Sequence, residues 1–99
     1  MRIDSKIRDI IKKEVAVQVG PESVVRLFGS RAIDTQKGGD IDLQIEPSEA
    51  VEDRVRVECR LSAALFIKLG GRKVDVLIRN PGSPFRLIDE QAHENGIIL

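Results

Sequence analysis

Two short motifs carry the residue types that phosphate and metal chemistry require. Gly29-Ser30 is typical of a turn that can hold phosphate, and Asp40 and Asp42 follow ten residues further on. In a β-strand every second side chain lies on the same face, so the two carboxylates are predicted to point together. Because neighbouring carboxylates repel each other, the pair suggests a bound cation, and Mg²⁺ suits carboxylate and phosphate oxygens. Taken alone, Asp-x-Asp is explained equally well as a polar strand edge beside a glycine-rich turn.

A third acid lies within an apolar run. Residues 73–79 are predicted to form a buried strand rich in β-branched side chains, with Asp75 inside it. A buried aspartate is rare unless it is paired or binds a metal. A salt bridge would also explain it, and the basic neighbours are Arg72, Lys73 and Arg79. Together with Asp40 and Asp42, Asp75 is predicted to complete a metal site on two neighbouring strands, of the kind that holds paired ions for nucleotidyl displacement.

The residues before the acidic pair can be assigned to phosphate binding. A predicted strand over residues 24–28 leads into Gly29-Ser30, which would offer backbone N–H groups and a hydroxyl to phosphates. Arg31 would contact the departing pyrophosphate, although a solvent-exposed salt bridge explains it equally well. Asp75 would then orient or deprotonate the attacking hydroxyl. The predicted chemistry is therefore transfer of a nucleoside monophosphate to a hydroxyl.

The composition is that of one small domain spanning residues 1–99. Hydrophobic residues make up 41% and charged residues 32% of the chain, which is typical of a folded soluble protein. Basic and acidic residues balance at 16 each, so no net field attracts nucleic acid or a membrane surface. The chain has three phenylalanines and neither Trp nor Tyr, which argues against a base-stacking platform for single strands.

Several features favour a cytoplasmic protein. No apolar run reaches the length of a membrane span, and residues 1–4 lack the apolar segment of a signal peptide. Cys59 is the single cysteine, so there is no disulfide framework and a reducing compartment is suitable.

Hydrophobic periodicity and turn residues predict the order of elements. The expected helices cover residues 3–18, a short turn at 31–33, 48–69 and 83–95, and the expected strands cover 24–28, 40–45, 73–79 and 97–99. A polar loop is expected at 34–39. This order predicts an α/β (α+β) fold in which a small mixed sheet is flanked by helices.

Two further predictions concern polar residues on helices. Arg54, Arg56, Glu58 and Arg60 are predicted to form a solvated helix face, but Glu58 and Ser62 fall close to the apolar face of that helix. This position suggests that the helix meets a partner there rather than the core. His93 is expected to complement the dipole at the end of the last helix.

The combined motifs carry a family resemblance. Gly29-Ser30-Arg31-Ala32, Asp40-Ile41-Asp42-Leu43 and Lys73-Val74-Asp75-Val76 resemble the minimal nucleotidyltransferase (MNT) family of the polymerase-beta-like nucleotidyltransferase superfamily. The resemblance covers essentially the whole chain, including residues 94–99 at its end.

The resemblance implies an activity and a partner. It implies a polymerase-beta-like palm in which Gly29, Ser30 and Arg31 bind the nucleotide. Asp40, Asp42 and Asp75 would then be both the catalytic residues and the ligands of two Mg²⁺ ions. MNT proteins are commonly paired with HEPN-domain RNase toxins, as antitoxins of type VII-like toxin–antitoxin pairs. The implied reaction is AMPylation, the transfer of AMP from ATP to a hydroxyl of the toxin, a tyrosine in some systems.

Alternative functions remain open at this stage. Nine residues lie between Ser30 and Asp40, one fewer than the family's pattern often has, and Ile33-Asp34 stand where it often has Arg-Gly. A displaced phosphate loop would leave an inactive MNT-fold antitoxin that neutralises the toxin by binding alone. Transfer to a small molecule is a weaker alternative, because relatives of that kind use a further domain to enclose the acceptor. Direct contact with nucleic acid or membrane is not expected, while either a hetero-oligomer or a homodimer is compatible.

Overall fold

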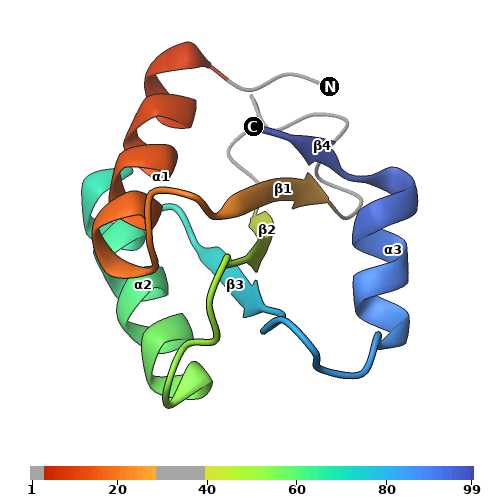
Figure 1. Cartoon of the computed structure of the whole chain (residues 1–99). Coiled ribbons are helices and arrows are strands. Elements are labelled where there is room, and N and C mark those ends of the chain that lie inside the picture. Colours follow the sequence, from red (N-terminus) through yellow and green to blue (C-terminus); the bar gives the residue numbers. More distant parts are fainter. Residues whose placement is uncertain (1–3, 29–39) are drawn as a thin grey trace.

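A four-stranded sheet lies between two layers of helices. The computed structural model describes residues 4–28 and 40–99 of the chain. Its elements in these ranges are α1 (Ser5–Gln18), β1 (Val24–Phe28), β2 (Ile41–Glu46), α2 (Arg54–Lys68), β3 (Val74–Ile78), α3 (Leu87–Asn95) and β4 (Ile97–Ile98). Helices α1 and α2 lie together on one side of the sheet, and α3 lies on the other (Figure 1). The predicted α/β class is confirmed, whereas the short turn and loop predicted over 31–39 fall outside the described residues.

The sheet is mixed, as predicted, and its strand order is β3-β2-β1-β4. Strand β1 pairs antiparallel with β2 and with β4, while β2 pairs parallel with β3. A parallel pair needs a long crossover connection, and α2 supplies it. The outermost strand on this side is therefore β3, with α2 packed against it.

The alternation of side chains along β2 separates the core from a polar face. Ile41, Leu43 and Ile45 have no exposed surface and face the core shared with α1 and α2. The remaining buried core side chains are Ile11, Val15, Val25, Leu27, Leu61, Leu65, Val74, Ile78 and Leu99. The positions between them on β2, which include Asp42, face the α3 side of the sheet.

Helix α2 begins later than predicted. It starts at Arg54 rather than near residue 48, because Asp53 is its N-cap and accepts a hydrogen bond from the Arg56 N–H. The segment before it is held in a non-helical shape by Asn80. The Asn80 side chain accepts from the Val51 N–H at 2.8 Å and donates to the Val51 carbonyl at 3.2 Å. A side chain from beyond β3 thus fixes the start of this helix.

Helix α3 also begins later than predicted, and β2 begins one residue later. The helix starts at Leu87 rather than at 83, because the Arg86 N–H bonds to Asp89 three residues on, in the manner of a capping box. Gly96 ends it, as expected. A Cβ on Gly96 would overlap the carbonyl oxygen of Ala92. Strand β2 starts at Ile41, so Asp40 precedes the strand instead of opening it.

Within residues 4–28 and 40–99, no helix has the length and apolar character required to cross a membrane.

Candidate active site

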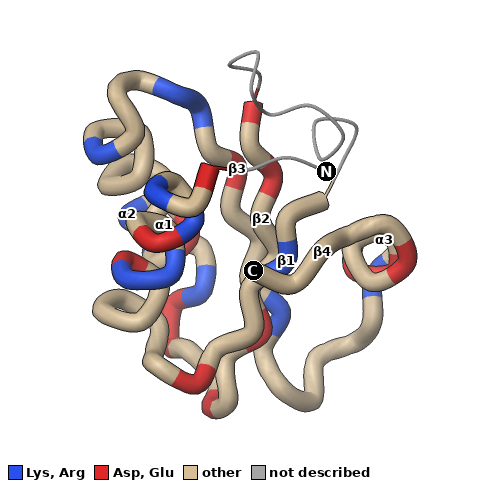
Figure 2. The backbone as a smooth tube through the Cα atoms, turned by 90° about the horizontal axis from the view of Figure 1, so that it is seen from above, with Lys and Arg blue, Asp and Glu red and all other residues tan. Residues whose placement is uncertain are grey.

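Two of the predicted site residues lie side by side on neighbouring strands. Asp42 of β2 and Asp75 of β3 are register partners in the parallel pair, and their carboxyl groups lie within hydrogen-bonding reach. Figure 2 shows acidic positions next to each other near the same end of β2 and β3. Because both residues have the same register position, their side chains lie on the same face of the sheet, toward α3. The sequence prediction that separate strands bring these two acids together is confirmed.

The neighbouring carboxylates change the pKa of Asp42. Burial raises the pKa of Asp42, the charge of Asp75 and a hydrogen bond with it raise the pKa further, and the charge of Asp40 adds to this effect. The charge of Lys73 acts in the opposite direction. The folded chain therefore holds a concentration of negative charge that a cation would relieve.

Asp40 and Asp75 are both exposed. Asp40 lies immediately before β2, so strand alternation does not set its direction, but its charge reaches Asp42. The prediction that Asp75 is buried is wrong, since 54% of its side chain is exposed. Its strand is the outermost of the sheet formed by residues 4–28 and 40–99, so this position has a neighbouring strand on one side only. The ion pair considered from the sequence forms with Lys73, at 4.0 Å from Nζ to Oδ1.

The fit to a divalent cation rests on the paired carboxylates. Asp42 and Asp75 offer hard oxygen ligands from two rigid strands, which is the chemistry that Mg²⁺ prefers. Residues 4–28 and 40–99 contain no preformed group of three His, Cys, Asp or Glu side chains that could hold a metal ion. A site with Asp40 as the third ligand would therefore need further oxygen ligands or a movement of Asp40, and remains a prediction.

The predicted nucleotide-binding residues follow β1 directly. Phe28, the last residue of β1, is the register partner of Asp42 in the antiparallel pair. Gly29, Ser30 and Arg31 come next in the chain and lie outside the described residues. Their assignment to nucleotide binding stays a prediction.

Three solved structures share the fold of this chain. No protein-family model and no curated protein matches the chain. A tri-AMPylated Shewanella oneidensis HEPN toxin in complex with MNT antitoxin matches with a TM-score of 0.69 and 18% identity, covering 97% of this chain and 71% of that one. The toxin–antitoxin complex MntA–HepT gives 0.71 and 17%, covering 96% and 70%. A toxin–antitoxin with AMP-PNP gives 0.70 and 21%, covering 93% and 70%. The chain has the MNT fold.

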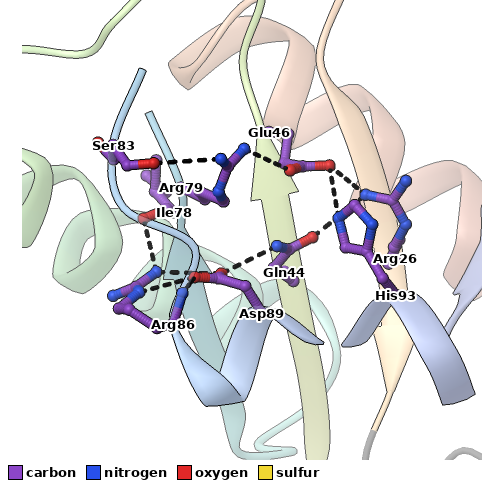
Figure 3. A network of polar contacts seen from close by, with 9 residues as sticks. All are labelled: Arg26, Gln44, Glu46, Ile78, Arg79, Ser83, Arg86, Asp89 and His93. Carbon is purple, nitrogen blue, oxygen red and sulfur yellow. Dashed lines mark hydrogen bonds and ion pairs between the residues drawn. The ribbon is translucent and has the colours of Figure 1, made fainter. Parts of the chain in front are cut away.

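In the MNT fold of this chain, a buried polar network joins β2, the strand that carries Asp42, to α3. Gln44, two residues after Asp42 on the same face of β2, has no exposed surface and donates to Asp89 of α3 at 3.0 Å (Figure 3). Asp89 is equally buried and accepts from Arg86 at the backbone N–H (3.0 Å), at Nε (2.8 Å) and at Nη2 (3.2 Å). Burial alone would raise the pKa of Asp89, but the hydrogen bonds from Arg86 and Gln44 outweigh it and lower the pKa to about 2.

Glu46, two residues further along β2, forms a second contact point. It pairs with Arg26 of β1, with Arg79 at 3.1 Å and with His93 of α3 at 3.1 Å (Figure 3). Burial acts to raise the pKa of Glu46, but hydrogen bonds from Arg26 and His93 give a net lowering. Phe85 packs edge-on to His93, with ring centroids 4.9 Å apart. His93 thus joins α3 to the sheet, in addition to its predicted place near the helix end.

Sequence reasoning missed Gln44 and Asp89, although two signals were present. Asp42, Gln44 and Glu46 alternate with the apolar residues of β2, so a polar face on a strand with neighbours on both sides required partners. The Arg86-to-Asp89 spacing is that of a capping box. Helix α3 covers Gln44 and Glu46 and leaves Asp42, at the start of the strand, beside Asp75.

Glu58 and Ser62 make structural contacts within the chain, and the predicted contact of this helix with a partner stays a prediction. A Glu58 carboxylate oxygen accepts from the Ile78 N–H at 2.7 Å and from Arg54 at 2.7 Å. The Ser62 hydroxyl donates to the Val74 carbonyl. Both side chains fix α2 to the outer edge of β3.

Proposed function

We propose that this chain is a Mg²⁺-dependent nucleotidyltransferase that transfers AMP from ATP to a tyrosine hydroxyl on a HEPN-domain partner, and so acts as an antitoxin. The observation that carries the proposal is the register pairing of Asp42 with Asp75, with the charge of Asp40 acting on the same group. The MNT fold supports it, as does the fact that the solved neighbours include an AMPylated HEPN toxin and an AMP-PNP complex.

The described residues can perform distinct parts of this reaction. The acceptor oxygen attacks the α-phosphorus, the bond to the β-phosphate oxygen breaks, and pyrophosphate leaves. Asp75, which is exposed at the edge of the sheet, would orient the acceptor hydroxyl and take its proton. Asp42, Asp75 and Asp40 would hold Mg²⁺, which when bound neutralises phosphate charge. Lys73 lies beside Asp75 and adds a positive charge at the same end of the sheet.

The first experiment measures transfer of label from α-phosphate-labelled ATP to the partner. A HEPN-domain protein, sought in the adjacent reading frames, serves as the partner and is co-expressed and co-purified with this chain. With Mg²⁺, the wild-type chain is expected to label the partner, and the double variant Asp40→Asn/Asp42→Asn to lose about 100-fold or more of the rate. Asp9→Asn removes an exposed carboxylate on α1 and should leave the rate unchanged.

The alternative, neutralisation by binding alone, gives a different result in the same assay. It is favoured by the absence of a preformed three-ligand metal site within residues 4–28 and 40–99. A chain that binds and neutralises the partner, yet transfers no label from any of the four nucleoside triphosphates, would overturn the transferase proposal. Neutralisation that survives in the Asp40→Asn/Asp42→Asn variant would point the same way.

A further inference from the structure

A largely apolar groove runs along the outer edge of β3, between this strand and α2. It has a volume of about 690 Å³. Its lining includes Cys59, Ala63, Phe66, Ile67, Asp75 and Val76. Phe66 is 48% exposed and Ile67 77% exposed, which is unusual for large apolar side chains that flank a hollow. Asp75 belongs both to this groove and to the pair of carboxylates at the candidate active site.

The strand order determines from which side an acceptor can reach those carboxylates. Strand β2, which carries Asp42, has β1 on one side and β3 on the other. On the β1 side, Phe28 is the register partner of Asp42, and the sequence predicts nucleotide binding by the residues that follow Phe28 in the chain. On the β3 side, the described part of the chain places no further strand beyond Asp75. The groove, which is lined by residues of β3 and α2, occupies this open side.

The backbone at this edge retains unused hydrogen-bonding groups. In a parallel ladder, every second residue directs both its N–H and its C=O to the neighbouring strand. In β3 the residues bonded to β2 are the odd-numbered ones from 73 to 79, so the N–H and C=O groups of Val74, Val76 and Ile78 point away from β2. Ser62 occupies the Val74 carbonyl and Glu58 occupies the Ile78 N–H. Within residues 4–28 and 40–99, the Val74 N–H and both the N–H and the C=O of Val76 are left without such a partner.

We propose that this groove receives the acceptor-bearing segment of the partner protein, in an extended conformation. The segment would pair its backbone with Val76, pack an apolar side chain against Phe66 and Ala63, and present its hydroxyl to Asp75 at the end of the groove. Edge pairing supplies backbone hydrogen bonds, while the apolar lining selects the side chain. This inference rests on the proposed function for the identity of the segment.

Cys59 provides a direct probe of the groove. It is the single cysteine of the chain, is exposed, and lies in the lining. Its rate of alkylation by iodoacetamide can be followed by mass spectrometry in the free chain and in the complex with the co-expressed HEPN protein. Occupation of the groove is expected to slow alkylation of Cys59 about tenfold or more, because the bound segment excludes the reagent.

Substituting aspartate for an apolar residue of the groove tests the same surface through the affinity for the HEPN protein. Phe66→Asp is expected to weaken binding of the HEPN protein about tenfold or more. When the two proteins are mixed at concentrations near the wild-type Kd, Cys59 of this variant should therefore be alkylated at the rate of the free chain. Ile67→Asp is a second variant at a more exposed position, so a folding defect in one variant does not decide the result. Val17→Asp puts the same charge on an apolar side chain of α1 that is 76% exposed, and should change neither affinity nor protection.

The outcomes separate the groove from the chemistry. Label transfer to the partner with Cys59 alkylated as fast as in the free chain would overturn the groove and leave the proposed function standing. Protection of Cys59 without any transfer would support the groove and overturn the transferase. Protection in the isolated chain that increases with its own concentration would identify a second copy as the occupant and would also overturn the inference.

Discussion

Replacing Asp42 with asparagine is expected to make the cation-free protein more stable and to abolish its stabilisation by Mg²⁺. In the folded chain, Asp42 is half-buried and faces the charges of Asp75 and Asp40, which is why its pKa is raised. Asparagine has the same shape without the charge, so the repulsion disappears and the free energy of unfolding should rise by about 0.5–1 kcal/mol at pH 7.

The stabilisation by the cation should be large in the wild-type chain and small in the variant. With Mg²⁺ at ten times its Kd, the wild-type chain should gain about 1.4 kcal/mol, because the ion binds only the folded state. Asp42→Asn should gain little, since one of two adjacent carboxylates is lost. Urea unfolding with and without Mg²⁺ measures both changes, and Asp9→Asn is the matched control. An Asp42→Asn protein that gains as much as wild type would place the cation elsewhere.

Replacing Asp89 with asparagine is expected to destabilise the fold more than any surface change. The Asp89 carboxylate is buried, receives three hydrogen bonds from Arg86 and one from Gln44, and caps α3. The variant leaves Arg86 without its charge partner and Gln44 without its acceptor geometry, so we expect a loss of about 2–4 kcal/mol in the free energy of unfolding at pH 7.

A matched control and a double variant sharpen this measurement. Glu90→Gln neutralises the exposed neighbouring acid in the first turn of α3 and should change stability by less than about 0.5 kcal/mol. Arg86→Met in the Asp89→Asn background should cost less than it does in wild type, because the guanidinium has then already lost its partner. Equal costs in both backgrounds would show that the buried pair contributes no coupling.

The pH dependence of stability should reveal the same carboxylate. The pKa of Asp89 is lowered from 3.8 to about 2 on folding, so the folded state holds this proton less tightly than the unfolded state. The resulting stabilisation is fully present above pH 3.8 and is lost as the pH falls through about 2, which amounts to roughly 2 kcal/mol. Urea midpoints between pH 5 and 2 should decrease less steeply in Asp89→Asn than in wild type, and parallel curves would contradict the assignment.

The sequence predicted the order of elements because its apolar spacing is strong. Ile41, Leu43 and Ile45 alternate cleanly, and every helix and strand predicted in residues 4–28 and 40–99 is present. The starts of α2 and α3 were placed too early, since Ser48-Glu49 and Ser83-Pro84 also look like helix caps. The cap that forms at Asp53 follows a segment held by Asn80, which lies far along the chain and cannot be read from local residues.

The sequence predicted that Asp42 and Asp75 lie together, but not that Asp75 is exposed to solvent. The pairing of Asp42 with Asp75 follows from two acidic strands brought together by one helix, and the structure confirms it. A β-branched run looks the same in a central strand and in an outermost strand, so the exposure of Asp75 was missed. The contact between Gln44 and Asp89 joins residues 45 positions apart, a separation at which a single sequence holds no pairing information.

The side chains of α2 at the outer strand have a consequence for solubility. An uncovered strand edge is a template on which further copies of a chain can add, and such growth leads to aggregates. Ser62 and Glu58 occupy the backbone groups on either side of Val76, so a foreign strand can make contact at one residue but cannot extend a continuous ladder. The chain can therefore leave one short backbone contact open without exposing a whole strand to self-association.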